Sequence, residues 1–375
     1  MKHQYRIAAG MLWIAGLAHA QLNSKIELPK DSPVGLLKAD FSNSSASPRG
    51  GTNVIDVSAV LSLRNSSGKR IRGITLAVYA QDIAPGGKGS FSVSSLDVAP
   101  GEVFPVRIEN RLLRPLGSVG GGIGPTVEIK LDGVLFDDLS FYGPDTLPSK
   151  NSLTVWELEA RRDRKYFKGL LESAGQEGLQ KEMIAGLARQ GDRQRLGGQP
   201  GVQMVRGRVT NAEPEQQMQF AFIQMPDSPL EPLTGSAKVS SREARAPRFS
   251  VHNRSGRAID HFEIAWIIKH QGQNSQPMRE FFAASMPADM KLGPNQTGEI
   301  REDSVLRFQE PLAIQGITGF VSSVAFADGE YWVPSLNSLT GSKLRELLPA
   351  SPEELHLQQI YSKRGLNALV QELKK

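Results

Sequence analysis

Two patterns in the sequence bring together side chains that could take part in catalysis. Asp137 and Asp138 are adjacent carboxylates, the residue type that glycoside hydrolysis uses in pairs. They lie in a predicted strand, where successive side chains point to opposite faces, so they do not converge on one bond. Ser66 and Lys69 have the spacing of a serine–lysine nucleophile pair, but they lie in a predicted turn and not on a helix. Neither pattern predicts an enzyme.

Metal and phosphate sites need other patterns. The histidines of the predicted mature chain all lie in its second half: His252, His261, His270 and His356. No two of them have the spacing of metal ligands within a motif. The glycine-rich residues 120–124 precede a predicted strand and lack the following Lys–Ser/Thr pair of a phosphate loop. The sequence therefore predicts neither a metal nor a cofactor, and we assign no catalytic residue.

One aromatic position is a candidate ligand platform. Residues 326–332 read as a tight hairpin that turns at Asp328 and Gly329. In the simplest register Phe326 faces Tyr331 on the inner side of the sheet, and Trp332 lies opposite Ala325 on the outer side. We expect the helix that follows to cover Trp332, and a ligand platform is the alternative.

The first half of the chain has the same arrangement, with Tyr142 in the place of Trp332. It differs at the turn, where Leu139 replaces Gly329 and makes a positive-φ turn less favourable. Tyr142 and Trp332 are therefore the candidate ligand platform, one for each half.

The two halves of the sequence repeat each other. Residues 61–78 align without a gap with residues 249–266, 188 positions later, and include a run of identities: Ser62/Ser250, Asn65/Asn253, Ser67/Ser255, Gly68/Gly256, Ile71/Ile259 and Ala77/Ala265. Chance would give on the order of one identity over such a span. A second block, offset by 190, pairs Val134, Phe136, Asp138 and Pro144 with Val324, Phe326, Asp328 and Pro334. This internal similarity predicts a duplicated folding unit.

Apolar residues alternate with polar ones inside each copy, as in Leu61 and Leu63 or Ile264 and Trp266. Alternation bounded by turn residues at short intervals is typical of antiparallel sheets. Residues 65–69 and 253–257 are predicted hairpin connections, with glycine at a positive-φ position. The fold class is therefore mainly β, with two antiparallel immunoglobulin-like β-sandwiches, each followed by helical segments.

Helical patterns follow each copy. Residues 151–190 carry an apolar stripe, residues 191–201 read as a linker, and Ser351 to Glu354 has the pattern of a capping box that opens a helix. We predict sandwiches at residues 21–150 and 202–335, helices at 151–190 and 336–375, and independent folding of residues 22–190 and 202–375.

The N-terminus predicts export. Lys2 and Arg6 precede a short apolar run, and small residues before Gln21 place a signal-peptide cleavage after Ala20. We therefore expect a periplasmic or extracellular protein with no transmembrane segment in the mature chain. The chain has no cysteine, so no disulfide is expected. Its formal net charge is +5, but its basic residues are not clustered as they are in nucleic-acid-binding proteins.

The repeated Asn-x-Ser-Gly turn, the later proline turn at residues 98–100 and 292–294, and the closing Phe-x-Asp strand resemble the immunoglobulin-like modules of exported bacterial proteins, of the FxLYD-like kind. The resemblance covers most of both copies and implies a fold, but no catalytic residues. We expect a non-enzymatic binding or scaffolding protein that contacts an envelope protein or polymer through its sheet edges or the cleft between its two repeated units. The alternative is an accessory or weakly hydrolytic module acting on cell-wall or polysaccharide material.

Overall fold

The computed structural model describes residues 23–80, 87–115, 127–195, 202–206, 214–271, 278–288, 290–301 and 304–374. The chain divides into two compact units: unit 1 runs to Val93 and continues over Asp97–Leu147, and unit 2 comprises Ser94–Leu96 and Pro148–Lys375. The protein is mainly β, with several sheets and a C-terminal helical region. No helix in the described ranges is both long and apolar enough to cross a membrane.

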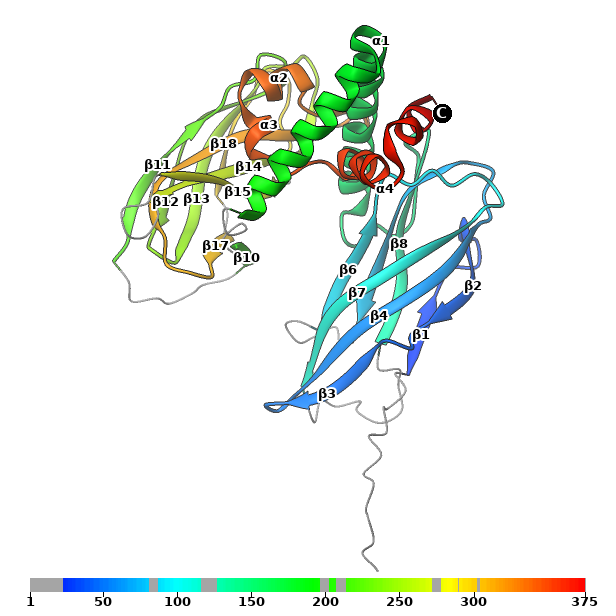
Figure 1. The fold of residues 1–375 in the computed structure, drawn as a ribbon. Helices are drawn as coiled ribbons and strands as arrows, with labels where there is room; N and C mark the ends of the chain where they lie inside the picture. Colours follow the sequence, from blue (N-terminus) through cyan, green and yellow to red (C-terminus); the bar gives the residue numbers. More distant parts are fainter. Residues whose placement is uncertain are drawn as a thin grey trace, which may run out of the picture. The chain divides into compact units, whose positions relative to one another are not determined.

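Unit 1 contains two sheets (Figure 1). One has the order β1-β8-β5-β6, with β9 paired to β8: β1 (Ser24–Glu27), β8 (Val127–Phe136), β5 (Ile71–Tyr79), β6 (Lys88–Val93) and β9 (Phe141–Tyr142). The other has β4 at its centre, paired with three strands: β2 (Val34–Asp40), β3 (Ser45–Arg49), β4 (Thr52–Asn65) and β7 (Val103–Pro115). Buried residues alternate along β4 and β7, which confirms the period of two in this half.

The repeated turn connects two sheets and is not a hairpin. β4 and β5 belong to different sheets of unit 1, so residues 65–69 carry the chain from one sheet to the other. The predicted positive-φ glycine is also wrong, because neither Gly68 nor Gly256 has positive φ. A side chain shapes the turn instead. Asn65 is fully buried, its Nδ2 donates to Lys69 O at 2.8 Å and Val98 O at 3.1 Å, and its Oδ1 accepts from Ser67 N at 3.0 Å.

The strands of unit 2 form one continuous sheet, in the order β10-β17-β13-β12-β11-β18-β14-β15, with β16 paired to β13 and β19 paired to β18. Their bounds are β10 (Val202–Arg206), β11 (Gln216–Phe222), β12 (Leu230–Val239), β13 (Glu243–Asn253), β14 (Ile259–Gln271), β15 (Arg279–Ala288), β16 (Thr297–Arg301), β17 (Ser304–Phe308), β18 (Ala313–Phe326) and β19 (Tyr331–Trp332).

Strand β11 joins the two parts of this sheet. Its first half pairs antiparallel with β12, and its second half pairs parallel with β18. Buried residues from both parts, including Phe249 of β13 and Trp266 of β14, belong to one hydrophobic cluster. The two parts therefore enclose a common core.

The β18–β19 hairpin is shifted by one residue from the predicted register. Trp332 pairs with Val324, and Tyr331 pairs with Ala325. The shift arises because the loop has three residues: the N–H of Gly329 donates to Phe326 O at 3.0 Å, and Gly329 has φ 87°. A three-residue loop with its last residue in the left-handed region is a common hairpin type.

The equivalent loop of unit 1 has the same backbone despite its sequence. Leu139 has φ 63°, and its N–H donates to Phe136 O at 3.0 Å. The sequence-based expectation that Leu139 disfavours a positive-φ turn is therefore wrong. The shared strand pairing imposes the turn, and leucine accepts the backbone strain.

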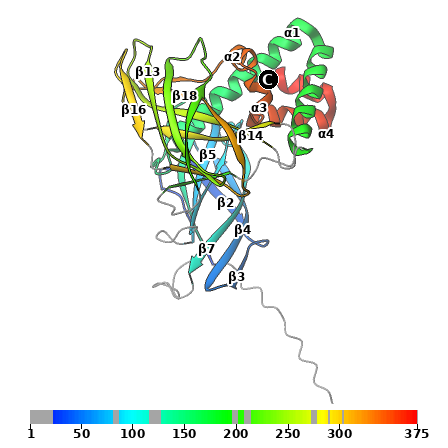
Figure 2. The same cartoon turned by 90° about the vertical axis from the view of Figure 1, so that its left-hand side faces the viewer.

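The helices of unit 2 lie together in Figure 2. Their bounds are α1 (Ser149–Arg195), α2 (Leu336–Gly341), α3 (Leu344–Leu347) and α4 (Pro352–Lys374). α1 bends at Gly175, with φ 67° and ψ −165°, and α4 bends at Gly365. Both bends occupy backbone conformations that glycine tolerates far better than other residues.

α1 packs against α4 in unit 2. Phe167, Leu179 and Met183 of α1 share a buried cluster with Leu357 and Leu369 of α4. The sequence assigned this helix to the half that ends at residue 190, whereas its contacts place it with the C-terminal half. α1 also extends to Arg195, into the predicted linker, of which residues 196–201 lie outside the described residues.

Candidate functional site

Most residues that the sequence singled out are engaged in structural contacts. Asp138 forms an ion pair with Lys69 at 2.6 Å, and this contact lowers the pKa of its carboxyl well below the usual range. In unit 2, Arg257 Nε donates to Asp328 Oδ2 at 2.9 Å, and the Arg257 guanidinium lies 4.0 Å from the centre of the Phe326 ring. These carboxylates hold turns together.

The histidines do not gather into a site. His252 Nδ1 shares a hydrogen bond of 3.0 Å with Thr297 Oγ1, and the His270 ring packs edge-on against Phe281. Among the described residues no group of three His, Cys, Asp or Glu side chains is arranged to hold a metal ion.

Tyr142 and Trp332 are both half-buried. Trp332 packs against the core between the two parts of the unit 2 sheet and against a second cluster under α2 and α3. Burial, together with a hydrogen bond to Asp31, raises the pKa of the Tyr142 hydroxyl. Whether either ring binds a ligand stays a prediction.

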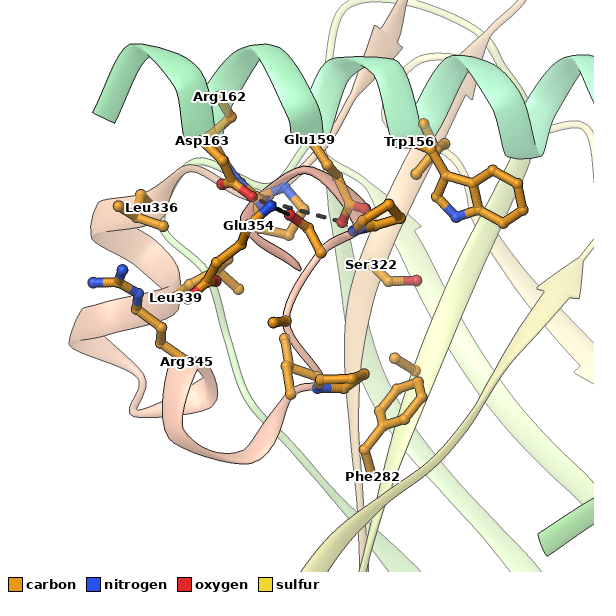
Figure 3. A pocket seen from close by; sticks show the side chains of 18 of the residues that line it. Trp156, Glu159, Arg162, Asp163, Phe282, Ser322, Leu336, Leu339, Arg345 and Glu354 are labelled. Atoms are coloured by element: carbon orange, nitrogen blue, oxygen red, sulfur yellow. Dashed lines mark hydrogen bonds and ion pairs between the residues drawn. The ribbon is translucent and has the colours of Figure 1, made fainter. Parts of the chain in front are cut away.

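A cavity that the sequence did not reveal lies in unit 2, where α1 and the segment around α2 and α3 cover one face of β14, β15 and β18 (Figure 3). Its volume is about 270 Å³. α1 contributes Trp156, Glu159, Arg162 and Asp163, and the sheet contributes Glu263, Phe282, Ser285, Phe320 and Ser322. Leu336, Leu339, Arg345 and Glu354 complete the wall from the C-terminal segment.

Helical spacing places the α1 residues on the cavity. Trp156, Glu159 and Asp163 are separated by three and four positions, so they share one face of the helix. Figure 3 shows Glu159 projecting from α1 toward Ser322 on the sheet. Ser351, which caps α4 by accepting from Glu354 N at 3.0 Å, also donates to Asp163 Oδ2 at 2.5 Å. That contact joins the start of α4 to α1 beside the cavity.

Glu159 is the most perturbed carboxyl of the cavity. Burial raises its pKa to about 7, the nearby Arg162 charge opposes this, and the Asp163 and Glu263 charges raise it further. Its side chain is 27% exposed, and it lines the cavity. Its closest cationic partner among the described residues, Arg162 Nη1, is 3.9 Å away. Glu159 is therefore a carboxyl that titrates near neutral pH.

Glu263 stands on β14 across from α1. Burial raises the pKa of its carboxyl, and the positive charge at His261 opposes the rise. Its backbone oxygen accepts a hydrogen bond from Ser322 Oγ at 3.2 Å. Within the described ranges its carboxylate has no ion pair and no hydrogen-bond donor, in contrast with the paired Asp163.

Comparison of the sequence with models of known protein families and with curated proteins gives no match. A signal for part of this site was present in the sequence, because acidic residues interrupt an apolar helical stripe at Glu159 and Asp163. No local pattern connects these residues to Glu263, which lies about a hundred positions further along the chain.

Proposed function

We propose that this protein is an exported, non-enzymatic binding protein built from two immunoglobulin-like β-sandwiches, and that the cavity of unit 2 recognises an envelope protein or polymer. The observation that carries the proposal is the cavity itself, which combines aromatic walls with two carboxyls: Glu159, whose ion pair with Arg162 is 3.9 Å long, and Glu263, which has no ion pair among the described residues. Binding sites are usually concave, mostly apolar and supplied with few polar groups. A volume of about 270 Å³ suits a side chain or a single small group better than a nucleotide-sized cofactor.

Equivalent contacts in the two units support the duplication. Asn253 is buried like Asn65, and its Nδ2 donates to Arg257 O at 2.7 Å. Ile71 bridges to Val98 in unit 1 as Ile259 bridges to Leu292 in unit 2. Two sheets in unit 1 and two joined parts in unit 2 are the layers that a sandwich requires.

Retention on immobilised envelope material tests the binding function. Ser322→Phe places a ring in the cavity and should abolish retention, whereas Glu310→Gln, at an exposed residue that does not line the cavity, should preserve it. The thermal midpoint of each variant shows that the fold is kept. Equal retention of both variants would place the recognition surface elsewhere.

Export is tested separately, because residues 1–20 lie outside the described residues. Mass spectrometry of the exported protein should find Gln21 at its N-terminus. Recovery of the chain with residues 1–20 attached would remove the argument for export.

A second candidate function is weak hydrolysis of cell-wall or polysaccharide material, because carboxyls from α1 and β14 face one cavity. A glycosidase needs one protonated and one ionised carboxyl. Burial raises the pKa of both Glu159 and Glu263, and Asp163 is held by Arg162 at 2.8 Å and by Ser351. Binding therefore fits better than hydrolysis. Release of reducing ends by the wild type, lost in Glu159→Gln, would reverse this order.

A further inference from the structure

The charges around the cavity are unevenly compensated. Its arginines donate to other partners: Arg162 to Asp163 at 2.8 Å and Pro334 O at 3.1 Å, Arg189 to Glu182 at 3.0 Å and Glu354 at 3.4 Å, and Arg345 to Glu182 at 2.7 Å. Glu159 and Glu263 are left with weaker compensation, since the nearest cation to Glu159 lies at 3.9 Å. The part of the cavity between α1 and the sheet therefore has an excess of negative charge when these carboxyls ionise.

The same part of the cavity carries aromatic rings and hydroxyls. Trp156 comes from α1 and Phe282 from β15, and both are labelled in Figure 3 together with Ser322 of β18. Aromatic faces attract cations and also cover methylene groups. Serine oxygens can accept further hydrogen bonds from an ammonium group. Carboxylates, rings and hydroxyls from α1, β14, β15 and β18 thus line one cavity.

We propose that this cavity binds a protonated primary amine at the end of an aliphatic chain, with the ammonium between Glu159 and Glu263 and the methylene groups along Trp156 and Phe282. This inference rests on the proposed binding function and names its ligand class. A lysine side chain of a partner protein and a free alkyl diamine present the same chemistry. The compact ammonium, with three donors, suits two carboxyls from different elements better than a planar guanidinium, which favours one carboxylate bound through both oxygens.

Binding of the amine is coupled to ionisation of the cavity. The groups that act on Glu159 are Arg162 and Asp163 of α1 and Glu263 of β14, with His261 acting on Glu263. Glu354, Arg189 and Arg345 complete the charged groups of the wall. Because Glu159 has a pKa of about 7, raising the pH from 6 to 8 increases its ionised fraction by about tenfold, and the amine affinity should rise with it.

Calorimetric titration of the full mature chain tests the proposal with three probes: Nα-acetyl-lysine methylamide, its Nε-acetylated analogue and cadaverine. The two amines should bind and the uncharged analogue should not. Glu159→Gln and Glu263→Gln should each weaken amine binding by about tenfold or more, in line with a lost charge partner. Glu310→Gln is the matched control, since Glu310 is exposed and does not line the cavity.

The probes also separate the two sources of the amine. Much tighter binding of Nα-acetyl-lysine methylamide than of cadaverine identifies a protein partner, and equal affinities identify a small amine. Equal binding of the acetylated analogue, affinity that does not change between pH 6 and 8, or amine binding that survives both glutamine variants would overturn the proposal. If the amines fail while Ser322→Phe still abolishes retention on envelope material, the binding function stands with another ligand. If both results are negative, both proposals are wrong.

Discussion

At the scale of single residues, Glu159 links the cavity to the stability of the fold. An ionisable group whose folded pKa lies above its unfolded value binds a proton more tightly in the folded state. Burial raises the Glu159 pKa from 4.5 to about 7, so its stabilising contribution is fully present below pH 4.5 and is lost as the pH rises through 7. The cavity thus costs stability at neutral pH, as expected where a site is arranged for a ligand and not for packing.

Glu159→Gln should remove this dependence. We expect the variant to lose less stability than the wild type between pH 5 and 8, with a difference of at most about 3 kcal/mol at pH 8. Denaturant unfolding at several pH values measures it. Glu263 and Glu354 also have raised pKa values through burial, so only the difference between the two proteins reports on Glu159. Parallel pH profiles would show that Glu159 is not desolvated.

Asn253 shows that the repeated turn motif has a structural role. Its Nδ2 donates to Arg257 O at 2.7 Å and Gly293 O at 2.9 Å, and its Oδ1 accepts from Ser255 N at 2.9 Å. Asn253→Ala leaves these buried groups without partners and should destabilise unit 2 by about 3 kcal/mol. Ser255→Ala is the control and should cost about 1 kcal/mol. A thermal midpoint that is unchanged in Asn253→Ala would contradict the assignment.

Residue patterns predicted turns better than they predicted backbone angles. The repeated Asn-x-Ser-Gly was correctly placed at a turn, but the side chain of Asn65, and not Gly68, sets its geometry. Leu139 adopts φ 63° because the strands on either side fix the loop. Local propensity is a weak guide wherever strand pairing already determines the path of the chain.

At the scale of elements, the β18–β19 hairpin places Trp332 between two hydrophobic clusters. The sequence correctly locates this hairpin and its aromatic residue. A turn at Asp328 and Gly329 alone implies a two-residue loop, whereas the loop has three residues, so the strand pairing differs from the predicted register by one residue. Such a shift exchanges the faces of every side chain on the short strand. The platform interpretation therefore has to be tested on a ring that contacts the core.

Trp332→Ala should destabilise unit 2 by about 2 kcal/mol or more, because a large half-buried side chain is removed. The urea midpoint of the full chain measures the loss. Tyr142→Phe, which removes the hydroxyl that bonds Asp31 and keeps the ring, should cost no more than about 1 kcal/mol. An unchanged midpoint in Trp332→Ala, together with lost retention on envelope material, would favour the ligand platform over structural support.

The apolar residues of α4 do not lie on one stripe. Leu369, Val370 and Leu373 are buried, whereas Leu355 is 46% exposed. The bend at Gly365 divides α4 into two helices with different orientations, so a single stripe does not run along its length. Leu357 and Ile360 face the core in the first part instead.

At the scale of the whole molecule, the sequence predicts which segments form strands and helices and in what order, whereas the cavity depends on contacts between distant segments. The β content, the internal sequence repeat and the capping of α4 by Ser351 can each be recognised from patterns along the chain. Glu159, Glu263 and Ser322 meet only because α1 packs in unit 2. Neither strand alternation nor helical periodicity specifies which sheet a helix covers, so this site could not be predicted.

The packing of α1 predicts where the chain can be divided. Residues 23–147 should fold alone, since both sheets of unit 1 lie within them, and residues 148–374 contain unit 2 except for Ser94–Leu96. The division expected from sequence, at residues 190–202, would instead separate Phe167, Leu179 and Met183 from the α4 residues that they bury.

Thermal unfolding followed by circular dichroism compares fragments 148–374 and 202–374. We expect a cooperative transition in the longer fragment, and in the shorter one a loss of helical signal at lower temperature, because the apolar face of α4 is exposed to water. Equal midpoints and equal helicity per residue in α4 would mean that α1 contributes nothing to the fold of unit 2, and the cavity would then lack the helix that carries Glu159.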